Sequence, residues 1–347
     1  MAMPKLDGTV LVTGASGFIG GRLRDELLAA GCDVVAIRRP GSPPSKMGRS
    51  VQADYGNVSE LERVIAAEKP DYVLHVAGVT KGNSYEDFRL GNVMPTRNLL
   101  TALRQAHPDI KRFALVSSLT AYGPSATSAP HREEDPRSPI EYYGRSKLEA
   151  EQVVEEESGD VPWTILRPPA VYGPGDVDHF TLFQSAVLGW NLFYGNRDKC
   201  GSWIYVDDCV RGIVEAARDE RTVGKGYFLT SDVQLTWGQF QSEIVSAVGR
   251  AVRDLNLPEQ LMWVSAFAGE MATRVDKKPR LFNLQKAKMG AQQAWTCVGD
   301  AARRDFGFTA ETDLAEGIRL THEWYEANGW YKSLSLRGLA RRLGRSR

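Results

Sequence analysis

The stretch Thr13-Gly14-Ala15-Ser16-Gly17-Phe18-Ile19-Gly20 decides the fold of this chain. It follows an apolar strand pattern at residues 8–12 and leads into a helical pattern at residues 18–30, which ends at Gly31. Glycines here let the backbone approach a pyrophosphate, and the following helix offers its N-terminal amides and the positive end of its dipole. Because it lies between a strand and a helix, the turn predicts a dinucleotide site.

Length and charge exclude several classes of protein. The chain has 347 residues, with 43 Lys and Arg against 43 Asp and Glu. This length allows one large or two modest domains, and the neutral balance argues against nucleic-acid binding. No apolar run approaches the roughly 20 residues that span a bilayer. No signal sequence precedes the first strand, so we expect a cytoplasmic protein whose mature form begins here.

The four cysteines are scattered along the chain, without CxxC spacing or a partnering histidine cluster. They are Cys32, Cys200, Cys209 and Cys297. We therefore expect structural thiols and no metal site.

Strand patterns alternate with helical patterns through the first half of the chain. Further strands are expected at 33–37, 71–76, 112–117 and 163–166, and helices at 59–68, 92–106 and about 143–157. This alternation predicts an α/β fold, a Rossmann-type doubly wound parallel sheet. We expect a mainly dinucleotide-binding domain over 1–166, a smaller interwoven substrate-binding region over 167–330 and a basic amphipathic tail at 331–347.

Tyr143-Gly144-Arg145-Ser146-Lys147 places a phenol and an ammonium group one helical turn apart on the same face. A phenol has an ordinary pKa of about 10, so a nearby cation is needed to stabilise the phenolate near neutral pH. With a nucleotide at the first turn, the pair indicates proton transfer by Tyr143 coupled to hydride transfer. Ser118 ends a strand, where doubly wound sheets place their ligands. We expect Ser117 to be a capping or turn hydroxyl and His75 to be a packing histidine.

Together these motifs resemble the extended short-chain dehydrogenase/reductase family, including its epimerase/dehydratase and 3β-hydroxysteroid-dehydrogenase-like branches, from residue 9 to about residue 330. The resemblance rests on the first turn, Asp54, His75-Val76-Ala77-Gly78, Asn92, Ser117-Ser118, Tyr143 with Lys147, and Arg167-Pro168-Pro169-Ala170-Val171-Tyr172-Gly173-Pro174-Gly175.

The resemblance implies a role for each matching residue. Tyr143 would be the acid/base, Lys147 would tune its pKa and bind the nicotinamide ribose, and Ser118 would hydrogen-bond the substrate oxygen. Asp54 would contact the adenine, and Pro168 and Val171 would line the nicotinamide. The expected cofactor-binding residues are Gly14, Ser16, Gly17, Phe18, Ile19, Gly20, Arg38, Asp54, Ala77, Lys147, Pro168 and Val171.

The end of the second strand bears on cofactor preference. NAD-binding folds place an acidic side chain there for the adenosine ribose, whereas this chain reads Ile37-Arg38-Arg39-Pro40. An arginine suits a 2′-phosphate instead. The sequence therefore favours NADP(H), although an arginine stacked on adenine is also compatible with NAD(H).

Two segments distinguish this chain from sugar-nucleotide members of the family. Those members typically carry Arg-Tyr-Phe-Asn before Val-Tyr-Gly-Pro, where this chain has Arg167-Pro168-Pro169-Ala170. They also commonly carry Arg-Asp-Phe where this chain has Gly201-Ser202-Trp203. These replacements would leave a charged diphosphate poorly paired.

Later segments fit a hydrophobic ligand, although they could equally build a second core. They contain Phe180, Phe183, Trp190, Phe193, Tyr194, Leu261, Met262, Trp263, Val264 and Phe267. The tail at 331–347 alternates leucine with arginine, which fits either a helix on the inner face of an anionic membrane or a solvated end.

The sequence thus indicates an oxidoreductase that interconverts a ketone and a secondary alcohol on a hydrophobic substrate. Steroid- or sphingolipid-active family members, such as those reducing keto-ceramide, are the nearest resemblance. One alternative is a sugar-nucleotide epimerase or dehydratase with tightly bound NAD, and another is a non-catalytic NAD(P)-binding redox sensor. We expect a monomer or homodimer.

Overall fold

Seven parallel strands form the central sheet of the chain, whose computed structural model describes residues 3–42, 47–127, 129–231, 233–276 and 283–334. Their order is β11-β6-β5-β4-β1-β2-β3. The strands are β1 (Thr9–Thr13), β2 (Asp33–Arg38), β3 (Arg49–Gln52), β4 (Tyr72–His75), β5 (Arg112–Val116), β6 (Trp163–Arg167) and β11 (Lys225–Phe228). The order reverses beside β1, where doubly wound sheets bind ligands. This confirms the predicted fold class.

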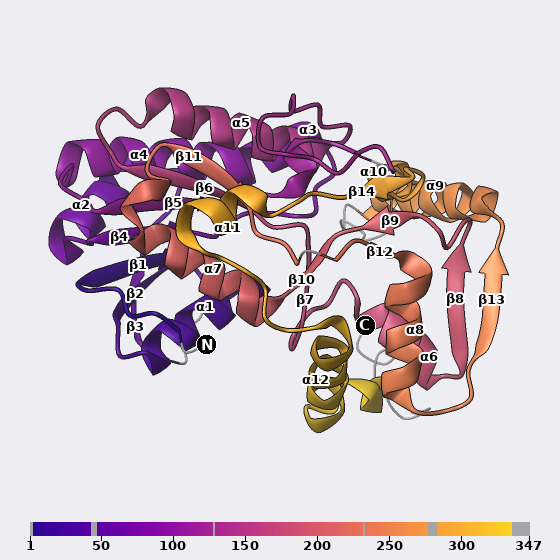
Figure 1. Cartoon of the computed structure of the whole chain (residues 1–347). Coiled ribbons are helices and arrows are strands. Elements are labelled where there is room, and N and C mark those ends of the chain that lie inside the picture. The colour runs from indigo at the N-terminus through magenta and orange to yellow at the C-terminus, as the bar shows by residue number, and fades with distance from the viewer. Residues whose placement is uncertain (1–2, 43–46, 128, 232, 277–282, 335–347) are drawn as a thin grey trace.

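Helices cover both faces of this sheet, because its central strands are mostly apolar and buried (Figure 1). One face carries α2 (Val58–Glu68), α4 (Met94–Ala106) and α5 (Tyr142–Glu157), and the other carries α1 (Phe18–Ala29) and α7 (Val206–Arg218). Each face has its own buried apolar cluster, so the sheet separates two cores.

The helix expected at residues 92–106 begins differently from the sequence pattern. A short helix α3 (Tyr85–Phe88) runs into a π-helical turn η1 (Arg89–Val93), and α4 follows. Asn92 lies in this π-helical turn. Such wide turns occur frequently at functional sites.

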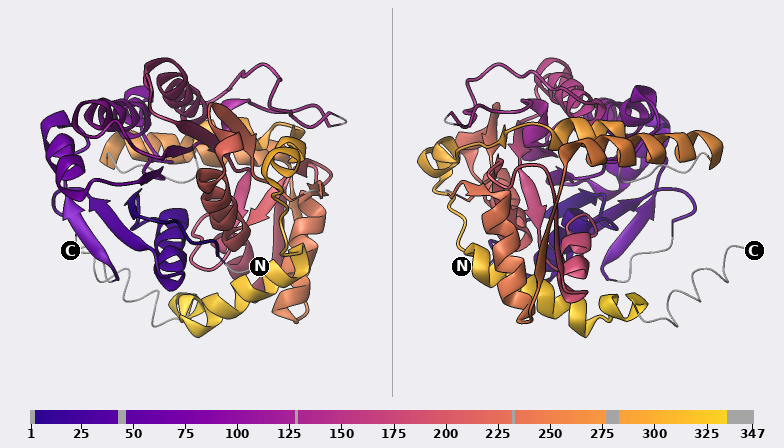
Figure 2. Two further views of the ribbon diagram at one scale, coloured as in Figure 1. Left: turned by 60° about the vertical axis from the view of Figure 1, so that its left-hand side comes forward. Right: turned by 90° about the vertical axis from the view of Figure 1, so that its right-hand side faces the viewer.

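The later part of the chain packs at the carboxyl ends of the strands. It contains β7 (Ala170–Tyr172), α6 (Phe180–Val187), β8 (Trp190–Tyr194), β9 (Cys200–Gly201), β10 (Trp203–Tyr205), β12 (Leu235–Thr236), α8 (Trp237–Val248), β13 (Arg253–Leu257), α9 (Glu259–Asp276), α10 (Leu284–Gly290), β14 (Ala294–Trp295), α11 (Asp300–Phe306), α12 (Leu314–Ala327) and η4 (Trp330–Leu334). Figure 2 shows α9 running across one side of the molecule, on the side opposite α12. β11 returns to the central sheet beside β6.

Neither interpretation of the later apolar residues, a second core or a hydrophobic ligand pocket, holds for all of them. Phe183 and Met262 are buried in core clusters, as a second core requires. A second group instead faces outward: Trp190, Leu261, Trp263, Val264 and Phe267. These exposed side chains form neither a core nor an enclosed pocket.

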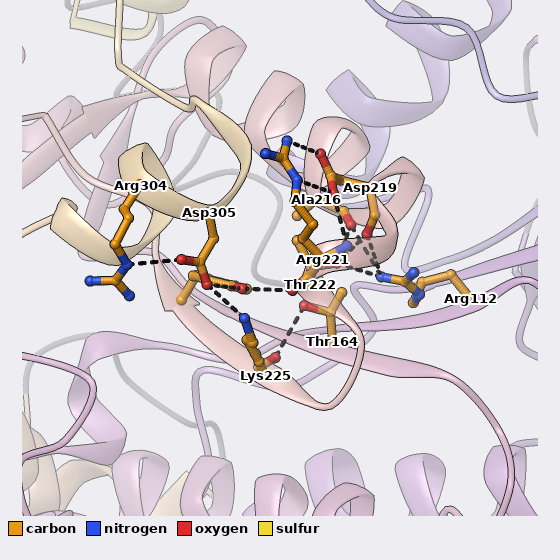
Figure 3. A network of polar contacts seen from close by, with 10 residues as sticks. Arg112, Thr164, Ala216, Asp219, Arg221, Thr222, Lys225, Arg304 and Asp305 are labelled. Carbon is orange, nitrogen blue, oxygen red and sulfur yellow. Dashed lines mark hydrogen bonds and ion pairs between the residues drawn. The ribbon is translucent and has the colours of Figure 1, made fainter.

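A polar network fastens the β11 edge of the sheet (Figure 3). Lys225 Nζ of β11 donates to Asp305 Oδ2 at 3.0 Å, and Arg304 binds the same carboxylate at 2.9 Å. On β5, the buried Arg112 guanidinium donates to the main-chain oxygen of Asp219 at 3.1 Å, after the end of α7. A cavity of about 690 Å³ opens beside this edge, but none of the predicted catalytic or cofactor residues lines it.

Three sequence predictions concern cysteines, metals and the tail. All four cysteines are free. Within the described residues, no cluster of three or more His, Cys, Asp or Glu is arranged to hold a metal ion, and no helix is long and apolar enough to cross a membrane. Residues 335–347 of the predicted tail lie outside the described residues.

Candidate active site

The glycine-rich turn has a backbone that other residues would not fit. Gly14 has φ +71°, and a Cβ there would lie 2.7 Å from the main-chain nitrogen of Ala77. A Cβ on Gly20 would lie 2.2 Å from the oxygen of Gly14, so α1 can pack this close to the turn only through glycine. Gly17 precedes α1 without any side-chain cap, and no acidic residue occupies the first turn of that helix. The first amides of α1 therefore suit a pyrophosphate.

The remaining residues of the turn lie between the end of β1 and the first turn of α1. Ser16 and Gly17 are exposed, and Phe18 and Ile19 begin α1. Thr13 Oγ1 accepts hydrogen bonds from the main-chain nitrogens of Val76 and Ala77 at 3.1 and 3.0 Å. The end of β1 is thereby fixed to the end of β4. This contact brings Ala77 next to the turn, and its binding of a cofactor stays a prediction.

His75 is a packing residue, as expected. Its ring is fully buried, with Nδ1 2.7 Å from Thr13 Oγ1 and Nε2 3.1 Å from Thr96 Oγ1. Burial and the nearby Lys147 lower the pKa of His75 to about 3, which keeps the imidazole neutral.

Gly78 and Asn92 connect the cofactor turn to the catalytic helix. Asn92 Oδ1 accepts from Val79 N at 2.7 Å, and its Nδ2 donates to Ser146 Oγ at 2.8 Å. A Cβ on Gly78 would lie 2.8 Å from Asn92 Oδ1 and 3.9 Å from Lys147 Nζ. Because Gly78 has no side chain, space remains beside the Lys147 ammonium.

Lys147 is buried, and its Nζ donates to Val116 O at the end of β5 at 2.7 Å. Burial lowers its pKa to about 8, although Glu151 opposes this shift. Lys147 therefore remains mostly charged at neutral pH. The ammonium lies between the end of β5 and Gly78, which follows β4, at the carboxyl edge of the sheet where a dinucleotide would be bound.

The pKa of Tyr143 is raised, whereas the sequence predicts that Lys147 lowers it. Burial raises the pKa of Tyr143 above its ordinary value, Glu141 and Asp178 raise it further, and a hydrogen bond with Ser118 lowers it. Lys147 was expected to lower this pKa, but here its ammonium is directed to Val116 O. The phenol is consequently protonated at neutral pH.

Ser118 is oriented by its own turn. Its Oγ accepts from Thr120 N at 3.2 Å and from Thr120 Oγ1 at 3.0 Å, at the start of the 3₁₀ turn η2 (Leu119–Ala121). Because a hydroxyl has one proton to donate, the Ser118 proton is left for Tyr143 or a substrate oxygen. A Cβ on Gly144 would lie 2.3 Å from Thr120 O, so glycine permits α5 to approach this turn.

A buried network of ion pairs stabilises α5, the helix that contains Tyr143 and Lys147. Glu151, one turn beyond Lys147, binds Arg167 at 3.0 Å and Arg137 at 2.9 Å. Ser117 Oγ donates to the same carboxylate, so Ser117 is not the capping or turn hydroxyl that we expected. Burial raises the pKa of Glu151, but these three partners outweigh burial and hold it below its usual range. Glu151 thus remains charged.

The other predicted cofactor residues lie at or after the ends of β2, β3 and β6, or in β7. Arg38 Nη1 donates to Ser42 O at 2.9 Å and to Gln52 Oε1 at 3.0 Å, while its buried Nε has no partner among the described residues. Asp54 is exposed after β3, and its carboxylate accepts from Gly56 N at 2.9 Å. Pro168 O accepts from Leu119 N at 3.0 Å, which places Pro168 beside the Ser118 turn. Val171 lies in β7, paired with Ile204.

Several residues of this centre were not identified from sequence. Glu151 repeats the spacing of Tyr143 and Lys147 by another four residues, and that signal could have revealed it. Gln285 of α10 could not be found this way, because its Oε1 accepts from Tyr142 N at 3.2 Å across 143 residues of sequence.

The arrangement fits a nicotinamide dinucleotide. The glycine turn and α1 would hold the pyrophosphate, and Lys147 would hold the nicotinamide ribose. A nicotinamide placed there would supply or accept a hydride, next to the phenol of Tyr143 and the hydroxyl of Ser118.

Comparisons with known proteins agree with this geometry. The chain is 29% identical to the ceramide reductase of Caulobacter vibrioides, covering 93% of this chain and 96% of that protein. It is 25% identical to human short-chain dehydrogenase/reductase family 42E member 1, covering 94% of this chain and 89% of that protein. Among solved structures, the UDP-glucose 4-epimerase of Thermotoga maritima superposes with a TM-score of 0.76 at 21% identity, covering 92% and 99%.

A family model also matches most of the dinucleotide-binding half and continues through β11. Residues 10–228 match the NAD dependent epimerase/dehydratase family, and this span contains the glycine turn, Ser118, Tyr143 and Lys147. The chain therefore belongs to the NAD dependent epimerase/dehydratase family and is an oxidoreductase-type enzyme that uses a nicotinamide cofactor.

Proposed function

We propose that this enzyme reduces a ketone to a secondary alcohol on a hydrophobic, lipid-like substrate, with NADP(H) as the preferred cofactor. The observation that carries the proposal is the placement of the Tyr143 phenol, which is hydrogen-bonded to Ser118 and lies one helical turn before the buried Lys147 in α5. A phenol is protonated at neutral pH, so it can give a proton to the alkoxide that forms in a reduction.

Each residue of the centre has a task in this reaction. Ser118 donates a hydrogen bond to the ketone oxygen and holds it beside Tyr143. Tyr143 transfers its proton to that oxygen as negative charge develops on it. The hydrogen bond with Ser118 then stabilises the phenolate that remains. Lys147 would hold the nicotinamide ribose, and Glu151 with Arg167 keeps α5 in place.

Three observations support a hydrophobic substrate. Trp203 is buried and stacks on Phe240 with ring centroids 4.8 Å apart, so this position offers no cation for a diphosphate. Ala170 lies opposite Trp203 in the β7–β10 pair. The similarity to a ceramide reductase over nearly the whole chain points to a lipid ketone.

Helix α9 adds an apolar surface beside the site. Its outward face includes Val264 and Phe267, which are 63% and 55% exposed. Residues 260–269 contain no charged side chain. α9 packs on α10 through Met262, Ala266 and Ala287, and Gln285 of α10 contacts the first turn of the Tyr143 helix. Exposed apolar surface of this extent marks an interaction site, and an acyl or steroid group would fit it.

Arg38 supports the preference for NADP(H). It ends β2, the strand beside β1, and its Nε is buried without a partner among the described residues. A buried, unsatisfied guanidinium nitrogen is costly, so an added acceptor would be favourable there. A 2′-phosphate is such an acceptor.

A sugar-nucleotide substrate is the second candidate. Part of the chain, over 177 residues, is 32% identical to the dTDP-6-deoxy-L-talose 4-dehydrogenase of Kitasatospora kifunensis. That match covers 50% of this chain and 55% of that protein, whereas the ceramide reductase match includes the substrate-binding part as well.

One experiment distinguishes the three candidate functions, which are keto-lipid reduction, conversion of a sugar nucleotide, and redox sensing without catalysis. Long-chain keto-lipids and sugar nucleotides are offered to the enzyme with NADPH or with NADH, and cofactor oxidation is followed by absorbance. We expect oxidation with keto-lipids, faster with NADPH. Conversion of sugar nucleotides without keto-lipid reduction would favour the second candidate, and no conversion of either would favour a sensor.

We further propose that the basic tail, residues 331–347, holds the enzyme near an anionic membrane. Its support is the sequence alone, which interleaves leucine with arginine and contains no acidic residue. Deleting residues 333–347 should abolish co-sedimentation with anionic vesicles but leave turnover of a short, water-soluble ketone unchanged. Vesicle binding that survives the deletion would contradict this role.

A further inference from the structure

The first turn of α5 has three amides whose hydrogen-bond partners must come from outside the helical ladder. Glu141, the N-cap, accepts two of these bonds: its Oε2 accepts from Tyr143 N and its Oε1 from Gly144 N, both at 2.6 Å. The third amide belongs to Tyr142, the residue directly before Tyr143. A partner that holds the Tyr142 amide therefore also fixes the backbone from which the Tyr143 phenol extends.

The partner of the Tyr142 amide comes from α10, in the later part of the chain. Gln285 Oε1 accepts from Tyr142 N at 3.2 Å. Lys288, one turn further along the same face of α10, donates from Nζ to Ile140 O at 2.7 Å. α10 therefore contacts the chain on both sides of Glu141, which caps the helix that contains Tyr143.

α10 is itself fixed to α9. Ala287 of α10 packs in a buried apolar cluster with Met262 of α9. The buried Lys199 donates from Nζ to Gly290 O, at the end of α10, at 2.7 Å and to Glu259 Oε2, at the start of α9, at 3.0 Å. A buried charge is costly to leave unpaired, so this ammonium keeps the two helices together. α10 thus joins the apolar surface of α9 to the first turn of α5.

Tyr143 also has fixed neighbours on the cofactor side. Its ring lies against Phe88, with ring centroids 6.4 Å apart, and its main-chain oxygen accepts from Ser146 Oγ at 2.7 Å. Ser146 in turn accepts from Asn92 Nδ2, beside the end of β4. Gln285 adds the contact from the substrate-binding part of the chain. The segment that contains the proposed acid is therefore placed by both parts of the molecule.

We propose that Gln285 is a positioning residue for Tyr143, which aligns the phenol with the oxygen of a substrate held beside α9 and α10. This inference rests on the proposed reduction, in which Tyr143 gives the proton. Gln285 itself transfers no proton. Because a displacement of about 1 Å can cost about 10²-fold in rate, loss of this contact should slow proton transfer while NADPH binding at the glycine turn is unchanged.

Gln285→Met tests this role, because it keeps the length and helix propensity of the side chain but removes the strong acceptor. We expect kcat for a long-chain keto-lipid to fall about tenfold, whereas KM and the NADPH dissociation constant should stay within about twofold. The ratio of turnover in H₂O to turnover in D₂O should rise, because proton transfer then limits the rate more strongly. Gln285→Glu keeps an acceptor at the positive end of the α5 dipole, so it should recover most of the lost turnover.

Gln292→Met is the matched control, because Gln292 lies just after α10 and its amide donates to the main chain of that helix, at Lys288 O. It should keep the turnover and the isotope ratio of the wild type. Wild-type turnover in Gln285→Met, an unchanged isotope ratio, or a loss that Gln285→Glu does not relieve would overturn the proposal. If the wild type converts only a sugar nucleotide, the proposed reduction fails, and the same comparison with that substrate decides the role of Gln285. A protein that converts neither substrate would overturn both.

Discussion

The site has two halves, which differ in how their side chains are held. The cofactor half consists of the glycine turn, Asn92 and α5, and the substrate half consists of the loop at residues 173–179 and α9. In the cofactor half, Asn92, Lys147 and Glu151 are buried and each is bonded to a fixed partner. In the substrate half, one carboxylate, Asp176, organises a whole loop, and the outer face of α9 has exposed apolar side chains.

This difference reflects what each half must recognise. A dinucleotide is always the same ligand, so a rigid frame of backbone and buried charges can be matched to it at little entropic cost on binding. A hydrophobic substrate gains its binding energy from apolar area, which needs few directional contacts. We therefore expect changes in the first half to impair chemistry or folding, and changes in the second half to alter selectivity.

The largest effect is expected from Tyr143→Phe. Removal of the proton donor without altering the ring should lower turnover by about 10²–10⁴-fold, as for loss of a general acid. NADPH binding, measured by fluorescence titration, should be nearly intact. Tyr142→Phe is the matched control on the same helix turn, and its turnover should remain close to that of the wild type. A Tyr143→Phe variant with more than about a tenth of wild-type turnover would exclude Tyr143 as the acid.

Glu151→Ala tests the rigidity of the cofactor half. It removes the closest partner of the buried Arg167 guanidinium and leaves only Glu155 at 4.0 Å, so the free energy of unfolding should fall by about 3–5 kcal/mol. Glu155→Ala, at a more exposed carboxylate that pairs with Arg137, should cost about 1 kcal/mol or less. Because the pKa of Glu151 is lowered in the folded protein, its stabilisation is present at neutral pH and is lost as the pH falls below the ordinary carboxyl range. Equal losses for the two variants, measured by urea unfolding, would contradict this role.

Arg38→Asp tests cofactor selection. Replacing the guanidinium with a carboxylate should weaken NADPH by about 10–100-fold, as for loss of a charge-assisted hydrogen bond, and should weaken NADH much less. The neighbouring Arg39 is exposed, and Arg39→Asp provides a comparison for general charge effects. Titration of both cofactors into all three proteins decides the matter. Equal losses for NADPH and NADH would show that Arg38 does not bind the 2′-phosphate.

A smaller effect is expected from pH. Burial lowers the pKa of Lys147 to about 8, so the ammonium loses its proton as the pH rises through that value. Affinity for NADH should then fall by about tenfold between pH 7 and pH 9 if one charged hydrogen bond is lost. Lys147→Met should bind weakly throughout this range. A wild-type affinity that is constant from pH 7 to pH 9 would show that the Lys147 charge does not contribute.

The local structure of the cofactor half could be predicted from sequence, for a physical reason. The glycine turn lies within a single strand–turn–helix unit, and the Tyr143–Lys147 pair lies within one helix, so local spacing specifies their geometry. The strand patterns also predicted the sheet, although the π-helical turn around Asn92 was not foreseen. Such a turn has no sequence period of its own.

The substrate half could not be assembled from local patterns. Gln285 meets Tyr142 across 143 residues of sequence, and His179 packs on Trp237 from another helix. Apolar composition also failed to separate core from surface, because Met262 is buried whereas its neighbours Leu261 and Trp263 are exposed. The pKa of Tyr143 depends on the same tertiary contacts, since burial and Asp178 raise it.

The proposed reduction is tested most directly by following the hydride itself. The enzyme is incubated with a long-chain keto-lipid and NADPH that carries two deuterium atoms at C4 of the nicotinamide, and the alcohol product is examined by mass spectrometry. We predict one deuterium on the carbinol carbon for each NADP⁺ formed, with the product lost in Tyr143→Phe. Epimerisation of a sugar nucleotide without net cofactor oxidation, and no deuterated alcohol from any keto-lipid, would contradict it.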